Sequence, residues 1–135
     1  MDRRRKDAGF SLVELIIVIA ILAILIGVLA PQYIKYVEKS RISSDNDNAD
    51  ALLEASHAML ADLDYFPTIS SGAKIEFNAA GISTSDSGVS SALAEYYSPD
   101  YSNRRPISKM YRHSTYVILF STNAKGDFLL YDSWR

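Results

Sequence analysis

The stretch Gly-Phe-Ser-Leu-Val-Glu at residues 9–14, followed by the charge-free run at residues 15–34, decides the fold of this 135-residue chain. The run contains 20 residues, and its first part, residues 15–30, is almost wholly Ile, Leu, Val and Ala. An α-helix rises about 1.5 Å per residue, so 20 residues span roughly 30 Å, the thickness of the hydrocarbon core of a bilayer. The sequence therefore predicts a membrane-spanning helix near the N-terminus.

Two other interpretations of the apolar run are open from the residues alone. A buried core helix is disfavoured because little other chain remains to cover every face of it. A secretory signal peptide is harder to dismiss, since Val-Leu-Ala at residues 28–30 has the small-residue spacing of a cleavage site. Pro31 follows directly, however, and the run is longer than the roughly 7–15 apolar residues usual in such peptides.

Composition limits the remaining classes of protein. Lys and Arg total 14 against 16 Asp and Glu, and there is no cysteine. A net charge of −2 argues against a general nucleic-acid-binding surface, although it leaves room for a local basic patch. Without cysteine there is neither a disulfide nor a thiolate, so the polar part of the chain must fold by packing alone.

The element at residues 9–14, with a short basic leader before it and unbroken aliphatic residues after it, resembles the class III signal of type IV prepilins and pseudopilins. In that family a prepilin peptidase cuts after the glycine and methylates the new terminal amine. The resemblance implies that leader 1–9 is removed, that the bond between Gly9 and Phe10 is cut, and that Phe10 is N-methylated. Glycine suits this position because it brings no side chain into a protease cleft.

Glu14 has a physical meaning that does not depend on the family. A carboxylate in a membrane helix costs about 2.5–3.5 kcal/mol at the bilayer centre, so such an acid needs a partner or a function. The new α-amino group of Phe10 on a neighbouring subunit is a cation that could pair with it in an apolar bundle. The alternative is that Glu14 only marks the interfacial end of the helix. The resemblance implies that Glu14 acts in assembly.

Charge does not decide the orientation in the membrane. Four basic residues precede the helix, at residues 3–6, and three follow it: Lys35, Lys39 and Arg41. The resemblance implies a cytoplasmic N-terminus, a single pass at residues 10–34 through the bacterial cytoplasmic (inner) membrane, and an exported globular head at residues 35–135. After assembly, the location would be an extracellular surface filament.

Beyond Pro31 the apolar residues recur near a 3.6-residue period, which predicts an amphipathic continuation of the helix to about residue 65. Pro31 itself is expected to kink or locally melt the helix. Residues 43–50 alternate acidic and amide side chains, which is typical of the start of a calcium loop, but the glycine turn and the distant glutamate are missing. A solvated helical face, or a break followed by a new N-cap, is favoured there.

The rest of the head is expected to be a variable loop at residues 66–108 and an antiparallel sheet at residues 109–132. Within the loop, a short strand at residues 73–77 and a helix at residues 91–97 are predicted. β-branched and aromatic residues at 111–121 and an apolar run at 128–131 flank turn residues, which predicts a hairpin. The fold class is α+β, a long helix packed against a small sheet, and resembles the pilin fold. Family members often have a C-terminal disulfide, so here burial of Phe128, Tyr131 and Trp134 must hold the end of the chain.

No enzymatic site, cofactor or metal is expected. The two histidines, His57 and His113, belong to no metal-binding spacing. A basic, aromatic patch is a candidate for binding DNA or an acidic surface, and its basic members are Arg104, Arg105, Lys109 and Arg112.

The resemblance implies a structural subunit of a type IV pilus that serves adhesion, motility or aggregation. Its partners would be other pilin subunits, the prepilin peptidase, and the membrane platform and ATPase of the assembly machine. The alternative within this class is a pseudopilin of a type II secretion or competence DNA-uptake system, which shares the same N-terminus. A monomeric, membrane-anchored binding module is a different class, and it would need neither Gly9 nor Glu14.

Overall fold

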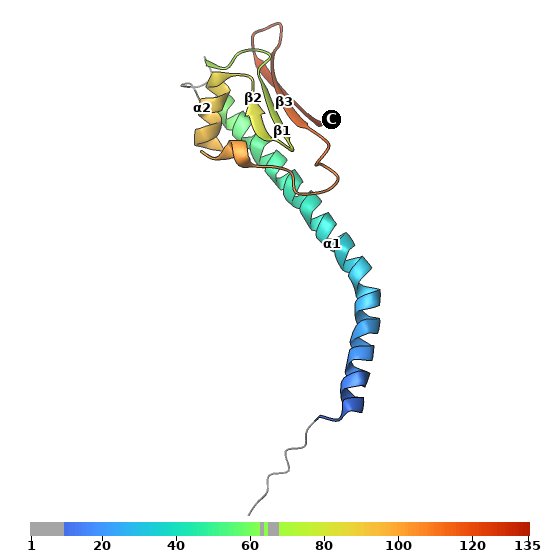
Figure 1. Cartoon of the computed structure of the whole chain (residues 1–135). Helices are drawn as coiled ribbons and strands as arrows, with labels where there is room; N and C mark the ends of the chain where they lie inside the picture. Colours follow the sequence, from blue (N-terminus) through green and yellow to red (C-terminus); the bar gives the residue numbers. More distant parts are fainter. Residues whose placement is uncertain (1–9, 63, 65–67) are drawn as a thin grey trace, which may run out of the picture. The chain divides into compact units, whose positions relative to one another are not determined.

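A computed structural model describes residues 10–62, 64 and 68–135 (Figure 1). The chain divides between Val37 and Glu38 into two compact units, and helix α1 (Leu12–Ala61) belongs to both. The second unit continues with β1 (Lys74–Asn78), β2 (Gly81–Thr84), α2 (Ser87–Tyr96), the 3-10 helix η2 (Tyr101–Asn103), β3 (Tyr116–Thr122) and β4 (Phe128–Trp134). A long N-terminal helix with a small antiparallel sheet confirms the predicted α+β class.

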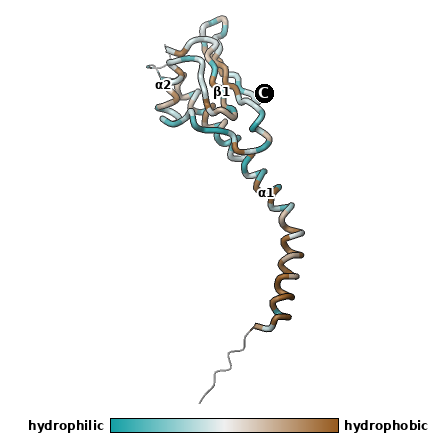
Figure 2. The backbone as a smooth tube through the Cα atoms, in the orientation of Figure 1, coloured by the Kyte–Doolittle hydropathy of each residue, from teal (hydrophilic) through white to brown (hydrophobic). Residues whose placement is uncertain are grey.

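Within the first unit, residues 15–34 of α1 carry no charge and are almost all apolar (Figure 2). The large apolar side chains of α1 in this unit are exposed within the single chain, from 48% for Val18 to 73% for Leu12. The helix is long and apolar enough to cross a membrane. Water is a poor solvent for such a surface, so this segment requires lipid or other apolar helices around it.

Pro31 lies inside α1, and the helix continues through it. The local melting expected from the sequence is therefore not found. Proline removes one backbone donor at a cost of about 3 kcal/mol, which a 50-residue helix absorbs because the turns on either side keep their hydrogen bonds. The kink at Pro31 stays a prediction.

The core of the second unit lies between α1, the sheet and α2. Buried residues of α1 recur every three or four positions, at Ala49, Leu52, Ala55 and Met59. They join one apolar cluster with the inward-facing side chains of the strands and of α2, which include Ile75, Phe77, Ile118, Phe120, Val89 and Leu93. Helix α1 thus ends as an ordinary amphipathic helix at Ala61, close to the expected boundary.

The sheet has four antiparallel strands in the order β2-β1-β3-β4. The predicted hairpin is confirmed as β3 and β4, but β3 begins at Tyr116 because residues 109–113 form turns and residues 114–115 are irregular. Phe128 and Trp134 are half-buried against the core, as expected. The expected burial of Tyr131 is wrong: it pairs with Leu119 in the register and is 58% exposed.

The segment expected to be a variable loop, residues 66–108, contains β1, β2 and α2. Strand β2 had no clear signal in the sequence. It starts at Gly81, where φ is +127° and an added Cβ would lie 2.0 Å from the carbonyl oxygen of Ser102. Only glycine fits there.

Helix α2 begins at Ser87, four residues before its predicted start. Asp86 is the N-cap, and its Oδ1 accepts hydrogen bonds from the N–H groups of Gly88 at 2.8 Å and Val89 at 3.2 Å. A hydrogen bond from the Ser70 side chain, supported by these backbone donors and opposed by burial, holds the pKa of Asp86 below its ordinary value. The ionised cap therefore fixes where α2 starts.

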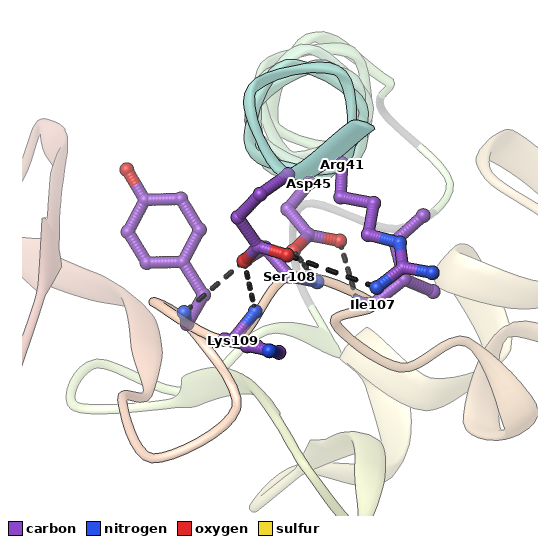
Figure 3. A network of polar contacts seen from close by, with 7 residues as sticks. Arg41, Asp45, Ile107, Ser108 and Lys109 are labelled. Atoms are coloured by element: carbon purple, nitrogen blue, oxygen red, sulfur yellow. Dashed lines mark hydrogen bonds and ion pairs between the residues drawn. The ribbon is translucent and has the colours of Figure 1, made fainter. Parts of the chain in front are cut away.

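Residues 43–50 are continuous helix, so the predicted break is absent. Asp45 is fully buried, contrary to a solvated face. Its two carboxylate oxygens accept hydrogen bonds from the backbone N–H groups of Ile107 and Ser108, each at 2.8 Å (Figure 3). One acid of α1 thus fixes the loop that leads into β3.

Replacing Asp45 with alanine should lower the free energy of unfolding of the head by about 2–3 kcal/mol, because two backbone donors would lose a charged acceptor in a buried place. Denaturant unfolding followed by fluorescence of Trp134, the single tryptophan, measures the loss. Asp47→Ala, at an exposed position on the same helix, is the matched control and should change the value by less than about 0.5 kcal/mol. Equal losses in the two variants would contradict the structural role of Asp45.

Replacing Asp86 with alanine should cost about 1 kcal/mol at neutral pH, because the cap of α2 is lost. The folded pKa of Asp86 is depressed, so the stability due to its ionised form is present above its unfolded pKa, about 3.9, and is lost as pH falls through the folded pKa. The difference in unfolding free energy between wild type and Asp86→Ala should therefore shrink below about pH 4. Asp86→Asn is the control, since asparagine keeps the cap but does not titrate. If the difference in unfolding free energy between wild type and Asp86→Ala is the same at all pH values, the prediction is wrong.

Candidate processing and assembly site

The N-terminal end of α1 is closed by a contact between Ser11 and Glu14. Ser11 precedes the first helical residue, and its backbone N–H donates to Glu14 Oε2 at 2.8 Å. The backbone N–H of Leu15 donates to the carbonyl oxygen of Ser11 at 3.2 Å. A glutamate three residues after the N-cap that reaches back to the N-cap N–H is one half of a capping box. The contact defines the start of α1 at Leu12.

This contact gives Glu14 a partner within its own chain. The carboxylate also lies in the first turn, where the free N–H groups of the helix favour a negative charge. Sequence reasoning treated Glu14 either as an acid in need of a cation or as a marker of the interfacial end of the helix, although Ser-Leu-Val-Glu at residues 11–14 matches the capping-box pattern. The N–H of Ser11 carries no net charge, so the contact orients the carboxylate without neutralising it.

The predicted cleavage site lies directly before this helix start. Phe10 is 88% exposed and precedes the N-cap residue. Gly9 and the remaining residues of the predicted leader, 1–9, lie outside the described residues. Cleavage before Phe10 would leave a new α-amino group four residues ahead of Glu14.

The four residues of the predicted basic patch lie along the loop between η2 and β3. The backbone N–H of Lys109 donates to Glu38 of α1, and Glu38 also pairs with Arg41 at 3.7 Å (Figure 3). Arg104 follows η2, where its N–H donates to the carbonyl oxygen of Tyr101 at 3.1 Å. The side chains of Arg105 and Arg112 are exposed.

Arg104 also lies close to the end of α2. Burial raises the pKa of the Tyr97 hydroxyl, and the nearby Arg104 guanidinium partly offsets this. Lys109 therefore bonds α1, whereas Arg104 lies near the end of α2.

The structure places both histidines at exposed positions, and neither indicates a catalytic or metal-binding site. His57 is exposed on α1, and His113 is exposed in the turns before β3. Within residues 10–62, 64 and 68–135, no group of three or more His, Cys, Asp or Glu side chains is placed to hold a metal ion.

Comparison with known proteins gives matches at the N-terminal end. The model of the prokaryotic N-terminal methylation motif matches residues 4–30, which include Gly9, Phe10 and Glu14. The type IV major pilin protein PilA of Myxococcus xanthus is 34% identical over 61 residues, which cover 45% of this chain and 28% of that protein. The prepilin peptidase-dependent protein A of Clostridium perfringens is 33% identical over 60 residues, 44% of this chain and 43% of that protein.

The similarity thus spans less than half the length of either relative. No solved structure matches the chain. The methylation motif, the two relatives and the long apolar helix with a small antiparallel sheet together support a prepilin with a class III signal and a pilin-like α+β arrangement.

Proposed function

We propose that the chain is a structural subunit of a type IV pilus. A prepilin peptidase cuts between Gly9 and Phe10 and methylates Phe10, and the processed subunit then polymerises with other pilin subunits into a surface filament. The observation that carries the proposal is a methylation motif at residues 4–30 that includes the start of a capped, unbroken helix whose apolar side chains are exposed. Such a surface needs lipid before assembly and neighbouring helices after it.

Glu14 provides the polar contact between subunits in this proposal. Once the leader is removed, the amine of Phe10 is a compact cation with no side-chain length. Its pairing with Glu14 of a neighbour satisfies both charges in an apolar bundle, where an unpaired charge is strongly destabilising. The capping contact with Ser11 holds the carboxylate at the helix end, ready for that partner.

Before assembly, residues 10–34 hold the subunit in the bacterial cytoplasmic membrane, with the leader on the cytoplasmic side and the head exported. Head-to-tail packing of identical subunits around a helix gives an open polymer. A membrane platform and an ATPase drive its growth, and adhesion, motility or aggregation follow from the filament. The role of the chain is structural and not catalytic.

Replacing Gly9 with leucine should leave an uncut precursor in the membrane and no filament, because a branched side chain would occupy the peptidase cleft at the scissile bond. Intact-mass and N-terminal analysis of membranes and of sheared surface material measures this. Wild type should begin at methylated Phe10 in the sheared fraction. Ala8→Leu, one residue from the scissile bond, is the control and should be cut, whereas normal processing of Gly9→Leu would refute the class III assignment.

Replacing Glu14 with alanine should leave cleavage intact and lower incorporation into filaments at least about tenfold, since loss of a buried charge partner costs several kcal/mol. Immunoblots of sheared and membrane fractions give the ratio. Glu54→Ala, at an exposed position of α1, is the control and should assemble normally.

Glu14→Gln separates two roles of this side chain. Glutamine keeps the capping contact with Ser11 but carries no charge. Assembly of Glu14→Gln should therefore be as poor as that of Glu14→Ala. Assembly at the wild-type level in Glu14→Gln would show that capping, and not pairing with an amine, is what the filament needs.

A further inference from the structure

Charge is unevenly distributed in the second unit. Residues 38–45 of α1 and residues 104–113 together hold six Lys and Arg against two acids, Glu38 and Asp45. All other positions of the unit hold three basic and eleven acidic residues. These two segments therefore have a net charge of +4, and the rest of the unit has −8. The two segments meet in the fold, since Glu38 and Asp45 both bond the backbone of the second.

The two acids of these segments, Glu38 and Asp45, both form hydrogen bonds within the protein. Asp45 is fully buried on the N–H groups of Ile107 and Ser108. Glu38 accepts from the N–H of Lys109 and pairs with Arg41 (Figure 3). What this region presents to the outside is therefore mainly cationic.

The turn at residues 107–114 is fixed from two sides. Contacts with α1 hold its first part, as described above. The Tyr111 ring stacks on Trp134 at the end of β4, with ring centroids 3.9 Å apart and planes at 9°. Tyr111 N–H donates to Ser108 Oγ at 3.2 Å, and Ser114 N–H donates to the carbonyl oxygen of Tyr111 at 3.1 Å. The fold thus holds this turn in one place.

Apolar and basic side chains alternate on the exposed side of that turn. Met110 is 61% exposed and Ile107 is 48% exposed. Lys109 and Arg112 beside them are exposed as well, and so is Arg41 on α1. We call the five residues Arg41, Ile107, Lys109, Met110 and Arg112 the neck surface. Aliphatic side chains among Lys and Arg are typical of a surface that binds the interface of an anionic bilayer.

The chain itself keeps this surface close to the membrane. Glu38 comes four residues after Ile34, the end of the charge-free run. Four residues reach at most about 14 Å even when fully extended. Each headgroup layer is roughly 5–8 Å thick and the Debye length at physiological salt is about 8 Å, so the backbone around Glu38 stays within electrostatic reach of the lipid.

We infer that the neck surface binds the anionic headgroups of the membrane that holds the subunit before assembly. This rests on the membrane-inserted stage of the proposed function and not on the filament. The basic side chains contact lipid phosphates while Met110 and Ile107 enter the interface. The acidic remainder of the head is repelled by the same surface, so the head is held with one side toward the bilayer.

The test uses the full chain in vesicles, with a fluorophore on Met110→Cys, which is a unique thiol because the chain has no cysteine. One set of vesicles is phosphatidylcholine, and the other also contains phosphatidylglycerol. Both contain a trace of lipid with a nitroxide quencher on its headgroup. Quenching should be at least about fivefold stronger in the anionic vesicles, as expected for even one Lys or Arg at such a surface, and should fall toward the phosphatidylcholine value near 1 M salt.

Matched charge variants and a second label position control the result. Lys109→Gln/Arg112→Gln removes two of the three basic residues of the neck surface and should at least halve the difference between the two vesicle types, whereas Lys74→Gln/Lys125→Gln removes the same charge elsewhere and should keep it in full. A label at Ala124→Cys, exposed in the β3–β4 turn, should not distinguish the vesicles. Fluorescence of Trp134, stacked on Tyr111, verifies that both variants keep the turn.

Equal quenching in both vesicle types, or a difference that Lys109→Gln/Arg112→Gln leaves at its full size, would overturn the inference. Quenching that depends on protein density and not on lipid charge would assign the neck surface to a neighbouring subunit. If only added DNA protects the fluorophore from quenching, the neck surface would be assigned to nucleic acid. Flotation of the vesicles separates the two proposals. If the chain floats with the vesicles but quenching is equal in the two vesicle types, only the lipid contact is refuted. If the chain does not float, the membrane anchor is refuted as well.

Discussion

The rest of the structure depends on the exposed apolar surface of α1 between residues 15 and 34. Its side chains find no cover within the described chain, and the hydrophobic effect makes their contact with water unfavourable by roughly 25 cal/mol for each Å². Lipid or a bundle of like helices must therefore supply the missing contacts. A single acid at the start of this helix, Glu14, adds a polar requirement to the apolar one. Its contact with Ser11 fixes its position but leaves its charge to be matched.

From Glu38 onward the same helix is part of the second compact unit. There its apolar residues fall on one face and form the core with the sheet and α2. Two acids of this part, Glu38 and Asp45, bond the backbone of the loop that follows η2. The backbone N–H groups of this loop thus gain charged acceptors, and the bond to the N–H of Ser108 is buried. Without a disulfide, this loop and the Tyr111–Trp134 stack hold the end of the chain through packing and hydrogen bonds.

Local sequence signals predicted much of the head. They failed where contacts between residues distant in the sequence determine the position or the burial of a residue. The β3–β4 hairpin could be predicted because turn residues separate two apolar runs. Strand β2 could not, since its place depends on the close approach of Gly81 to the backbone of Ser102. Asp45 was expected to be solvated because its neighbours are polar, yet its partners lie more than 60 positions away. Tyr131 was expected to be buried because it is aromatic, but the register with β3 directs it outward.

The sequence by itself determined the N-terminal part: a cleavage and methylation motif, an apolar helix of membrane length, an acid at its start and an amphipathic continuation. These features are local, since periodicity, length and a short motif need no distant partner to be recognised. Only the tertiary structure decided which charged side chains bond other parts of the head and which remain at the surface. Glu38 and Asp45 bond a loop far away along the chain, and Arg41, Lys109 and Arg112 are left at the surface beside Met110. The physical reason is that hydrogen bonds and burial depend on which segments meet in space, and that is set by the packing of the whole head.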